Sequence, residues 1–126
     1  MAYEIEFAAK FTVADPELYI NDCCWGGDVV RDKLLPIVNV GFSDVQTLQE
    51  DWGWFIWMDR GPRRICVDIF CDDKETGKFR IMITASQRSW FRRKPVDESG
   101  IEPLKNVVVN EIAKFGQIAR VEKISD

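Results

Sequence analysis

Apolar and polar side chains alternate along the first residues of the chain. One face of this segment carries Tyr3, Ile5, Phe7, Ala9, Phe11 and Val13, and the other carries Glu4, Glu6, Lys10 and Thr12. Successive side chains of a strand point to opposite sides of a sheet, so an alternation with period two predicts a strand. We therefore expect the chain to begin with a half-exposed strand that runs to about residue 13.

Helical signals follow this strand. Asp15, Pro16 and Glu17 offer an N-cap, a proline at the first helical position and an acid in the first turn. They predict a short helical stretch, which is expected to break near the glycine pair at 26–27.

A second helix is expected to begin with Asp28 as its N-cap. Its apolar positions recur at helical spacing and comprise Val30, Leu34, Ile37 and Val38. Pro36 comes late in this pattern and is expected to kink or end the helix. Residues 39–49 then read as a loop.

Three strands are predicted in close succession over residues 52–58, 64–71 and 79–85. A turn at residues 60–63 and a polar loop at residues 72–78 join them. Both connections are too short for a parallel crossover, so the three strands are expected to form an antiparallel meander.

An amphipathic helix and a last strand complete the pattern. The helix begins at Ile101, and its apolar stripe comprises Ile101, Leu104, Val108, Ile112 and Phe115. A short strand is expected over residues 118–124. The predicted order is β-α-β-β-β-α-β, which favours a single α+β domain over residues 1–126, with two helices packed on one face of an antiparallel sheet.

The first meander strand is apolar on both of its faces. Trp52, Trp54, Ile56 and Met58 are expected on one face, with Phe55 and Trp57 on the other. The core faces of the next two strands are Ile65, Val67 and Ile69, and Phe79, Ile81 and Ile83. Their opposite faces are mixed, so some of Phe55, Trp57, Phe70 and Met82 should be partly exposed beside Asp68 and Arg80. Such a surface resembles a protein-binding hot spot; a small secondary core under residues 88–100 is the alternative.

Composition narrows the class of protein. The chain of 126 residues has no stretch of about 20 apolar residues that could span a bilayer. Its first residues lack the basic start and apolar run of a signal peptide. We therefore expect no membrane association and a cytoplasmic protein.

The side chains available for chemistry are few. The chain contains no histidine, which excludes Ser-His-Asp and Cys-His nucleophilic sites and imidazole bases. The four cysteines lack the spacing of a zinc site and, without an export signal, are expected to be reduced and buried. We therefore expect no metal site, no cofactor and no enzymatic activity.

Charge is unevenly distributed along the chain. Residues 1–58 carry 3 basic and 10 acidic side chains, whereas residues 59–94 carry 10 basic and 5 acidic ones. This asymmetry can create an acidic face that attracts a basic partner.

Together with the segment "EDWGWFIWMD" at residues 50–59 and the short strands after it, the acidity of the chain resembles the small immunity proteins of bacterial toxin–immunity systems, including contact-dependent growth inhibition. This resemblance implies a protein that neutralises a cognate toxin by direct binding through an acidic surface. The partner-binding residues it implies are Glu17, Asp22, Asp28, Asp32, Glu50 and Asp51. The aromatic Trp57 is expected to join them.

Two other functions remain open. Trp90, Arg92, Arg93 and Lys94 combine stacking surface with positive charge, as in binders of single-stranded nucleic acid; such binding would weaken steeply with salt. A small-ligand or enzyme domain would instead use a pocket near Cys23, Cys24 and Trp25, between sheet and helices.

Overall fold

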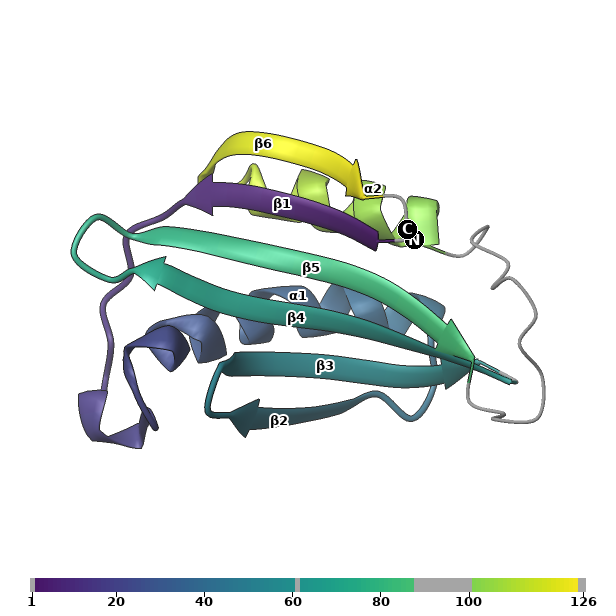
Figure 1. Ribbon diagram of the computed structural model, residues 1–126, viewed down its shortest axis with the longest axis horizontal. Coiled ribbons are helices and arrows are strands. Elements are labelled where there is room, and N and C mark those ends of the chain that lie inside the picture. The colour runs from purple at the N-terminus through teal and green to yellow at the C-terminus, as the bar shows by residue number, and fades with distance from the viewer. Residues whose placement is uncertain (1, 61, 88–100, 125–126) are drawn as a thin grey trace.

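The computed structural model describes residues 2–60, 62–87 and 101–124. Over these ranges the chain forms a six-stranded antiparallel sheet with two α-helices packed on one of its faces (Figure 1). The strands are β1 (Ala2–Ala8), β2 (Gln46–Glu50), β3 (Gly53–Arg60), β4 (Arg63–Asp73), β5 (Lys78–Gln87) and β6 (Gln117–Ile124). The helices are α1 (Gly27–Gly41) and α2 (Ile101–Ile112), preceded by the short 3-10 helices η1 (Pro16–Leu18) and η2 (Asp22–Cys24). The predicted α+β fold is confirmed.

The strands lie in the order β2-β3-β4-β5-β1-β6, and every neighbouring pair is antiparallel. The N-terminal strand β1 is therefore an inner strand, inserted between β5 and β6. Ala2 pairs with Thr84 on one side and with Ile124 on the other, so the two ends of the described chain lie side by side.

The core lies between the sheet and the two helices. Fully buried side chains reach it from the central strands and comprise Ile5, Phe7, Ile56, Met58, Ile65, Val67, Ile69, Phe79, Ile81 and Ile83. The helices contribute Val30, Leu34, Val38, Ile101, Leu104, Val108 and Ile112. Since these sets match the predicted apolar positions, the assignment of the core face is confirmed.

The structure contains one strand where the sequence pattern predicts a loop. β2 covers Gln46–Glu50 and pairs with β3, with Leu48 opposite Phe55. It is an edge strand, and Leu48 is its single apolar residue. One apolar position among polar neighbours carries no periodic signal, so the sequence pattern does not predict this strand.

The N-terminal segment also differs from the prediction. β1 ends at Ala8, and the next amide, that of Ala9, donates a hydrogen bond to the carbonyl oxygen of Gly77 (2.9 Å). Phe11 contacts the ring of Phe79 instead of extending the strand. The alternation of apolar and polar side chains therefore extends to residue 13, although the strand itself ends at Ala8.

Helix α1 departs from the prediction at both ends. Its N-cap is Gly26, in the left-handed conformation with φ of 72°, and Asp28 lies in the first turn. There Asp28 accepts a hydrogen bond from the hydroxyl of Tyr19 (2.7 Å). Pro36 does not end the helix, which continues to Gly41. Pro36 is exposed and Val38 is buried, so the packing of the next turn outweighs the one backbone hydrogen bond that proline removes.

Candidate protein-binding face

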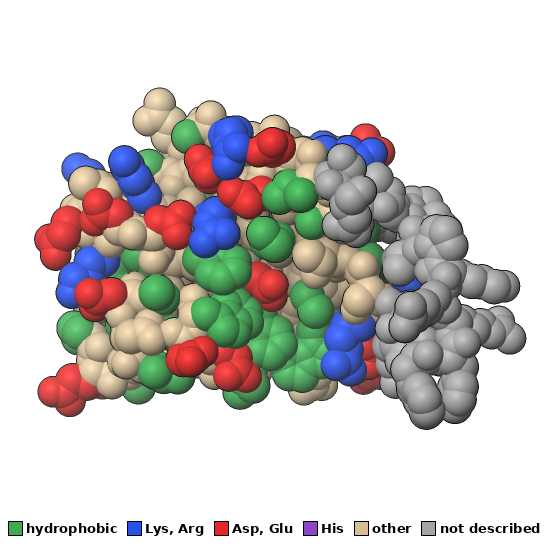
Figure 2. Space-filling view, in the orientation of Figure 1, with side chains coloured by type: hydrophobic (Ala, Val, Ile, Leu, Met, Phe, Trp, Pro, Cys, Tyr) green, Lys and Arg blue, Asp and Glu red, His purple; other side chains and the backbone are tan. Residues whose placement is uncertain are grey.

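The side of the sheet opposite the helices carries an apolar patch. Within the described residues no helix covers this side, and Figure 2 shows apolar side chains gathered at its centre with an acidic side chain among them. We define the open-face patch as Trp52, Phe55, Trp57, Phe70 and Met82, which surround Asp68. All six side chains are half-buried, so the expected partial exposure of this surface is confirmed.

Strand register brings these residues together. Phe55 on β3 lies directly opposite Asp68 on β4, and Asp68 lies directly opposite Met82 on β5. The same row continues to Leu48 on β2, whose side chain is 47% exposed. Directly paired residues of an antiparallel sheet share one face, so this row forms a continuous surface.

The aromatic rings of the patch contact one another. The ring centroids of Phe55 and Trp57 are 4.7 Å apart, and those of Trp52 and Phe70 are 5.2 Å apart. Trp52 also lies 5.6 Å from Phe55. Rings packed in this way present a large, rigid contact area with little conformational entropy left to lose on binding.

The position of Trp52 corrects the prediction. It was expected to share a face with Trp54, but it lies in the turn between β2 and β3 and packs on the opposite side. Trp54 points towards the helices, where its indole N–H donates to the carbonyl oxygen of Cys24 (2.9 Å). The alternation of a strand does not extend into a turn, so the strand pattern assigned Trp52 to the wrong face.

Asp68 is the charged group at the centre of the patch. Among the described residues, no hydrogen bond or ion pair reaches its carboxylate. Desolvation raises the pKa of Asp68 to about 6. The neighbouring Arg80 is engaged elsewhere, because its guanidinium lies over the ring of Phe70 (4.4 Å) and pairs with Asp72 (3.3 Å). The patch thus contains a carboxylate that has no positive partner within the described part of the chain, in surroundings that disfavour its charge.

The arginines described on this face are already paired with acids. Arg64 pairs with Asp59 (2.9 Å), and Arg120 pairs with Glu6 (2.6 Å). Arg120 also contacts Glu4 and Glu122. With these positive groups neutralised, Asp68 gives the described part of the face an excess of negative charge.

The predicted acidic residues gather only in part. Hydrogen bonds join residues 18–21 to β2 and its turn, from the amide of Ile20 to Oε1 of Gln49 (2.9 Å) and from Nδ2 of Asn21 to the carbonyl oxygen of Asp51. This brings Asp22 towards the β2–β3 turn, which carries Glu50 and Asp51. The exposed Glu17 lies in η1 of the same segment.

The remaining predicted acids are separate from the open-face patch. Asp28 and Asp32 belong to α1, on the helix side of the sheet, whereas Trp57 lies on the open side. Asp32 pairs with Arg31 (2.8 Å), and Asp22 pairs with Lys74 (3.2 Å). The structure therefore does not unite the predicted acids and Trp57 into one surface.

Trp90, Arg92, Arg93 and Lys94, the candidate nucleic-acid residues, lie outside the described residues. Residues 88–100, which the alternative hypothesis expects to cover the aromatic face as a small secondary core, also lie outside the described residues.

Cysteine chemistry receives little support from the geometry. Cys24 and Cys71 are buried and Cys66 is half-buried, but Cys23 is exposed, contrary to the expectation that all four would be buried. Burial raises the pKa of Cys71 to about 11 and also raises the pKa of Cys24 and Cys66. These three thiols are protonated at neutral pH and are poor nucleophiles. Among the described residues, no cluster of three or more acidic or cysteine side chains could hold a metal ion.

No family model matches the chain, and the comparisons with curated proteins and solved structures give no match either. No helix in the described ranges is long and apolar enough to cross a membrane. Functional inference therefore depends on the surface chemistry of the fold itself.

The raised pKa of Asp68 leads to a stability prediction. The pKa of Asp68 is higher in the folded chain, at about 6, than in the unfolded chain, where it is about 4. The folded state therefore holds this proton more tightly, and stability falls as the pH rises from about 4 to about 6. Because the side chain is partly exposed, we expect Asp68→Asn to raise the free energy of unfolding at pH 7.5 by only about 1 kcal/mol.

Urea unfolding of both proteins across pH measures this effect. The advantage of Asp68→Asn should be complete above about pH 6 and should shrink towards zero below about pH 4. An equal difference at every pH would show that Asp68 is not a destabilised carboxylate.

Proposed function

We propose that this protein is a non-catalytic protein-binding module that uses the open-face patch to bind its partner. The observation that carries this proposal is Asp68, a half-buried carboxylate without a positive partner among the described residues, surrounded by aromatic rings. A partner that brings a lysine or arginine side chain to Asp68, from within an apolar contact surface, would satisfy both features. Aromatic anchors around a desolvated charge are typical of binding hot spots.

The particular partner we propose is a bacterial toxin with a basic surface, which this protein neutralises as an immunity protein in the cytoplasm. The acidity of the chain and the paired state of the arginines on the open face support a positively charged partner. Direct occlusion needs no catalytic group on the inhibitor, which agrees with the absence of histidine.

The acids at the β2–β3 turn would serve as the rim of this interface. Glu50 lies on β2 opposite Gly53, next to Trp52 of the patch, and Asp51 follows in the turn. Exposed rim charges mainly accelerate association and add little affinity. Charge reversal at Glu50 and Asp51 is therefore expected to slow binding and to weaken its dependence on salt.

Binding to the product of the adjacent gene, supplied as a purified protein, tests the proposal. We expect a one-to-one complex with nanomolar affinity, and a loss of affinity of at least about 30-fold in either Trp57→Ala or Asp68→Asn. The affinity of the unaltered protein should also decline as the pH is lowered through about 6, because Asp68 must be ionised to pair with a cation.

Val107→Ala provides the matched control for these variants. Val107 is an apolar residue, 42% exposed, on the helix side of the molecule. The Val107→Ala variant should bind the partner with the same affinity as the unaltered protein. If Val107→Ala weakens binding while Trp57→Ala and Asp68→Asn do not, the open-face patch is not the binding surface.

A further inference from the structure

The outer edge of β2 has unpaired backbone groups. β2 ends the order of described strands, with β3 as its one neighbour (Figure 1). Glu50 pairs with Gly53 across a two-residue turn, and residues that flank such a turn exchange hydrogen bonds. The alternation of the ladder then directs the N–H and C=O groups of Thr47 and Gln49 away from β3. No backbone hydrogen bond from another described segment reaches them. These groups can pair with a further strand.

The two edges of the described sheet differ in their protection against such pairing. The other edge strand, β6, carries Arg120, Glu122 and Lys123, and charged side chains discourage the addition of a strand. In β2, by contrast, the first four residues are uncharged, and the strand contains neither lysine nor proline. β2 is therefore the edge that is open to a further strand.

Apolar side chains flank this edge on both sides of the sheet. On the open side, Leu48 continues the row of Phe55 and Asp68. On the helix side, the side-chain amide of Gln49 donates to the carbonyl oxygen of Leu18 (3.0 Å) and accepts from the amide of Ile20 (2.9 Å). Leu18 is 60% exposed and Ile20 is 59% exposed. Since side chains of a strand alternate between its two faces, an added strand would contact Leu48 on one face and Leu18 and Ile20 on the other.

The segments that form this edge are acidic. Residues 11–30 and 34–59 contain neither lysine nor arginine. The acids nearest to β2 in the sequence or joined to it by hydrogen bonds of their segment are Asp15, Glu17, Asp22, Asp44, Glu50 and Asp51. Lys74 pairs with Asp22 (3.2 Å), which still leaves an excess of negative charge. A second copy of this chain would bring the same acids to the edge, and like charges repel, whereas a basic segment would be attracted.

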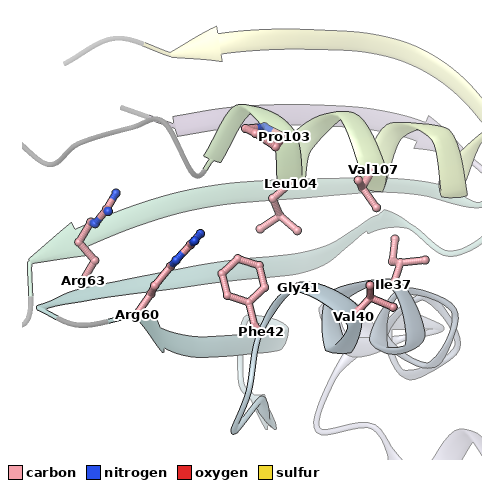
Figure 3. Close-up of a pocket in the computed structure, with 9 residues that line it drawn as sticks. All are labelled: Ile37, Val40, Gly41, Phe42, Arg60, Arg63, Pro103, Leu104 and Val107. Carbon is pink, nitrogen blue, oxygen red and sulfur yellow. The ribbon is translucent and has the colours of Figure 1, made fainter.

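The cavity of the molecule lies elsewhere. Its volume is about 710 Å³, and it lies between the end of α1 and the first turns of α2, with Arg60 and Arg63 at one end (Figure 3). Its lining includes no residue of β2 or of residues 15–22. Occupation of the cavity and pairing at the β2 edge would therefore give separate signals.

We propose that β2 receives a strand from the partner, an extended segment with apolar side chains in its middle and lysine or arginine at its ends. Its backbone would exchange hydrogen bonds with Thr47 and Gln49, as in other cases of strand addition. Its basic side chains would lie near Glu50, Asp51 and Asp44. This inference rests on the proposed function, because it states how the basic partner of the open-face patch would also engage the adjoining edge.

A synthetic peptide serves as the probe, with the sequence Lys-Arg-Val-Val-Val-Arg-Lys and acetyl and amide ends. At saturation it should slow the hydrogen exchange of the Thr47 and Gln49 amides at least about tenfold, with little change at Leu48, whose amide already bonds to β3. The same peptide with methylated valine nitrogens cannot donate these hydrogen bonds. It should bind at least about tenfold more weakly.

Thr47→Pro removes one outward N–H donor and should weaken peptide binding at least about tenfold. Thr47→Val is the matched control, because it keeps the N–H. Both variants lose the hydrogen bond from the Thr47 hydroxyl to the carbonyl oxygen of Phe55 (3.0 Å). Thr47→Val should bind the peptide with the affinity of the unaltered protein.

Leu48→Lys places a positive charge at the edge without altering the backbone, and it should weaken peptide binding at least about fivefold. Val121→Lys is its control. Val121 is an apolar residue, 41% exposed, on the other edge strand, β6. This replacement should leave peptide binding unchanged.

The strand addition is overturned if the peptide fails to protect the Thr47 and Gln49 amides, or if Thr47→Pro binds it as well as Thr47→Val does. A dimer of this protein that Leu48→Lys disrupts, together with no binding of the peptide, would instead assign the edge to a second copy. The proposed function fails separately. If the product of the adjacent gene binds without protecting Thr47 and Gln49, the strand addition is wrong and the proposed function stands. If that product does not bind but the peptide protects both amides, the proposed function is wrong and the strand addition stands.

Discussion

Gly53→Ala is expected to lower the free energy of unfolding by about 3 kcal/mol. Gly53 begins β3 with φ of +154°, a conformation that side-chain-bearing residues rarely adopt. A Cβ atom here would lie 2.1 Å from the carbonyl oxygen of Ile69, which is backbone and cannot rotate away. The start of β3 would have to separate from β4, which would also displace Trp52 and Phe70 of the open-face patch.

Gly41→Ala is the control for this prediction. Gly41 ends α1, and a Cβ atom added there would meet nothing within 4 Å. The same substitution should therefore be neutral or stabilise the protein by about 0.5 kcal/mol. Urea unfolding of the two variants gives the comparison. Equal stabilities would refute the close approach of β3 to β4 at Gly53.

Phe79→Ala is expected to cost about 3–5 kcal/mol, a large share of the stability of a domain of this size. Phe79 on β5 is fully buried at the centre of an aromatic cluster. Its ring centre lies 5.5 Å from that of Phe7, 5.3 Å from that of Phe11 and 6.2 Å from that of Trp25. Its removal would leave a cavity and would detach the segment before α1 from the sheet.

Phe70→Ala tests the same change on the opposite face. Phe70 on β4 is only half-buried, so its truncation should cost about 1 kcal/mol and leave a folded protein. Thermal and urea unfolding measure both variants. A greater loss of stability in Phe70→Ala than in Phe79→Ala would mean that the open face is a core in its own right and not a binding surface.

Phe79 and Phe70 illustrate the different roles of the two faces of the sheet. Side chains on the helix side, such as Phe79 and Ile81, stabilise the fold through burial. Side chains on the other side, such as Phe70 and Asp68, remain half-buried and stabilise it less. Ionised Asp68 is even expected to lower the free energy of unfolding at neutral pH. A partner that pairs with this carboxylate would offset the loss, as is typical of functional sites.

Much of the fold could be predicted from local pattern alone. Alternation in β3, β4 and β5 identified the core face, because the direction of a side chain in a strand depends only on its position along that strand. The helical stripe of Leu104, Val108 and Ile112 was correct for the same reason, with a period of 3.6 residues. The partial exposure of Trp57 and Phe70 also followed from this reasoning.

The sequence by itself determined which residues face the core and that the protein is an α+β domain. Only the tertiary structure decided that β2 pairs at the edge, that Trp52 turns to the open face, and that Arg60 and Arg63 share one end of a cavity. These features depend on contacts between segments distant in the chain, and no local period encodes such contacts. The environment of Asp68 among the described residues is of the same kind, because register across three strands placed Arg80 beside Asp72 and left aromatic and apolar side chains around the carboxylate.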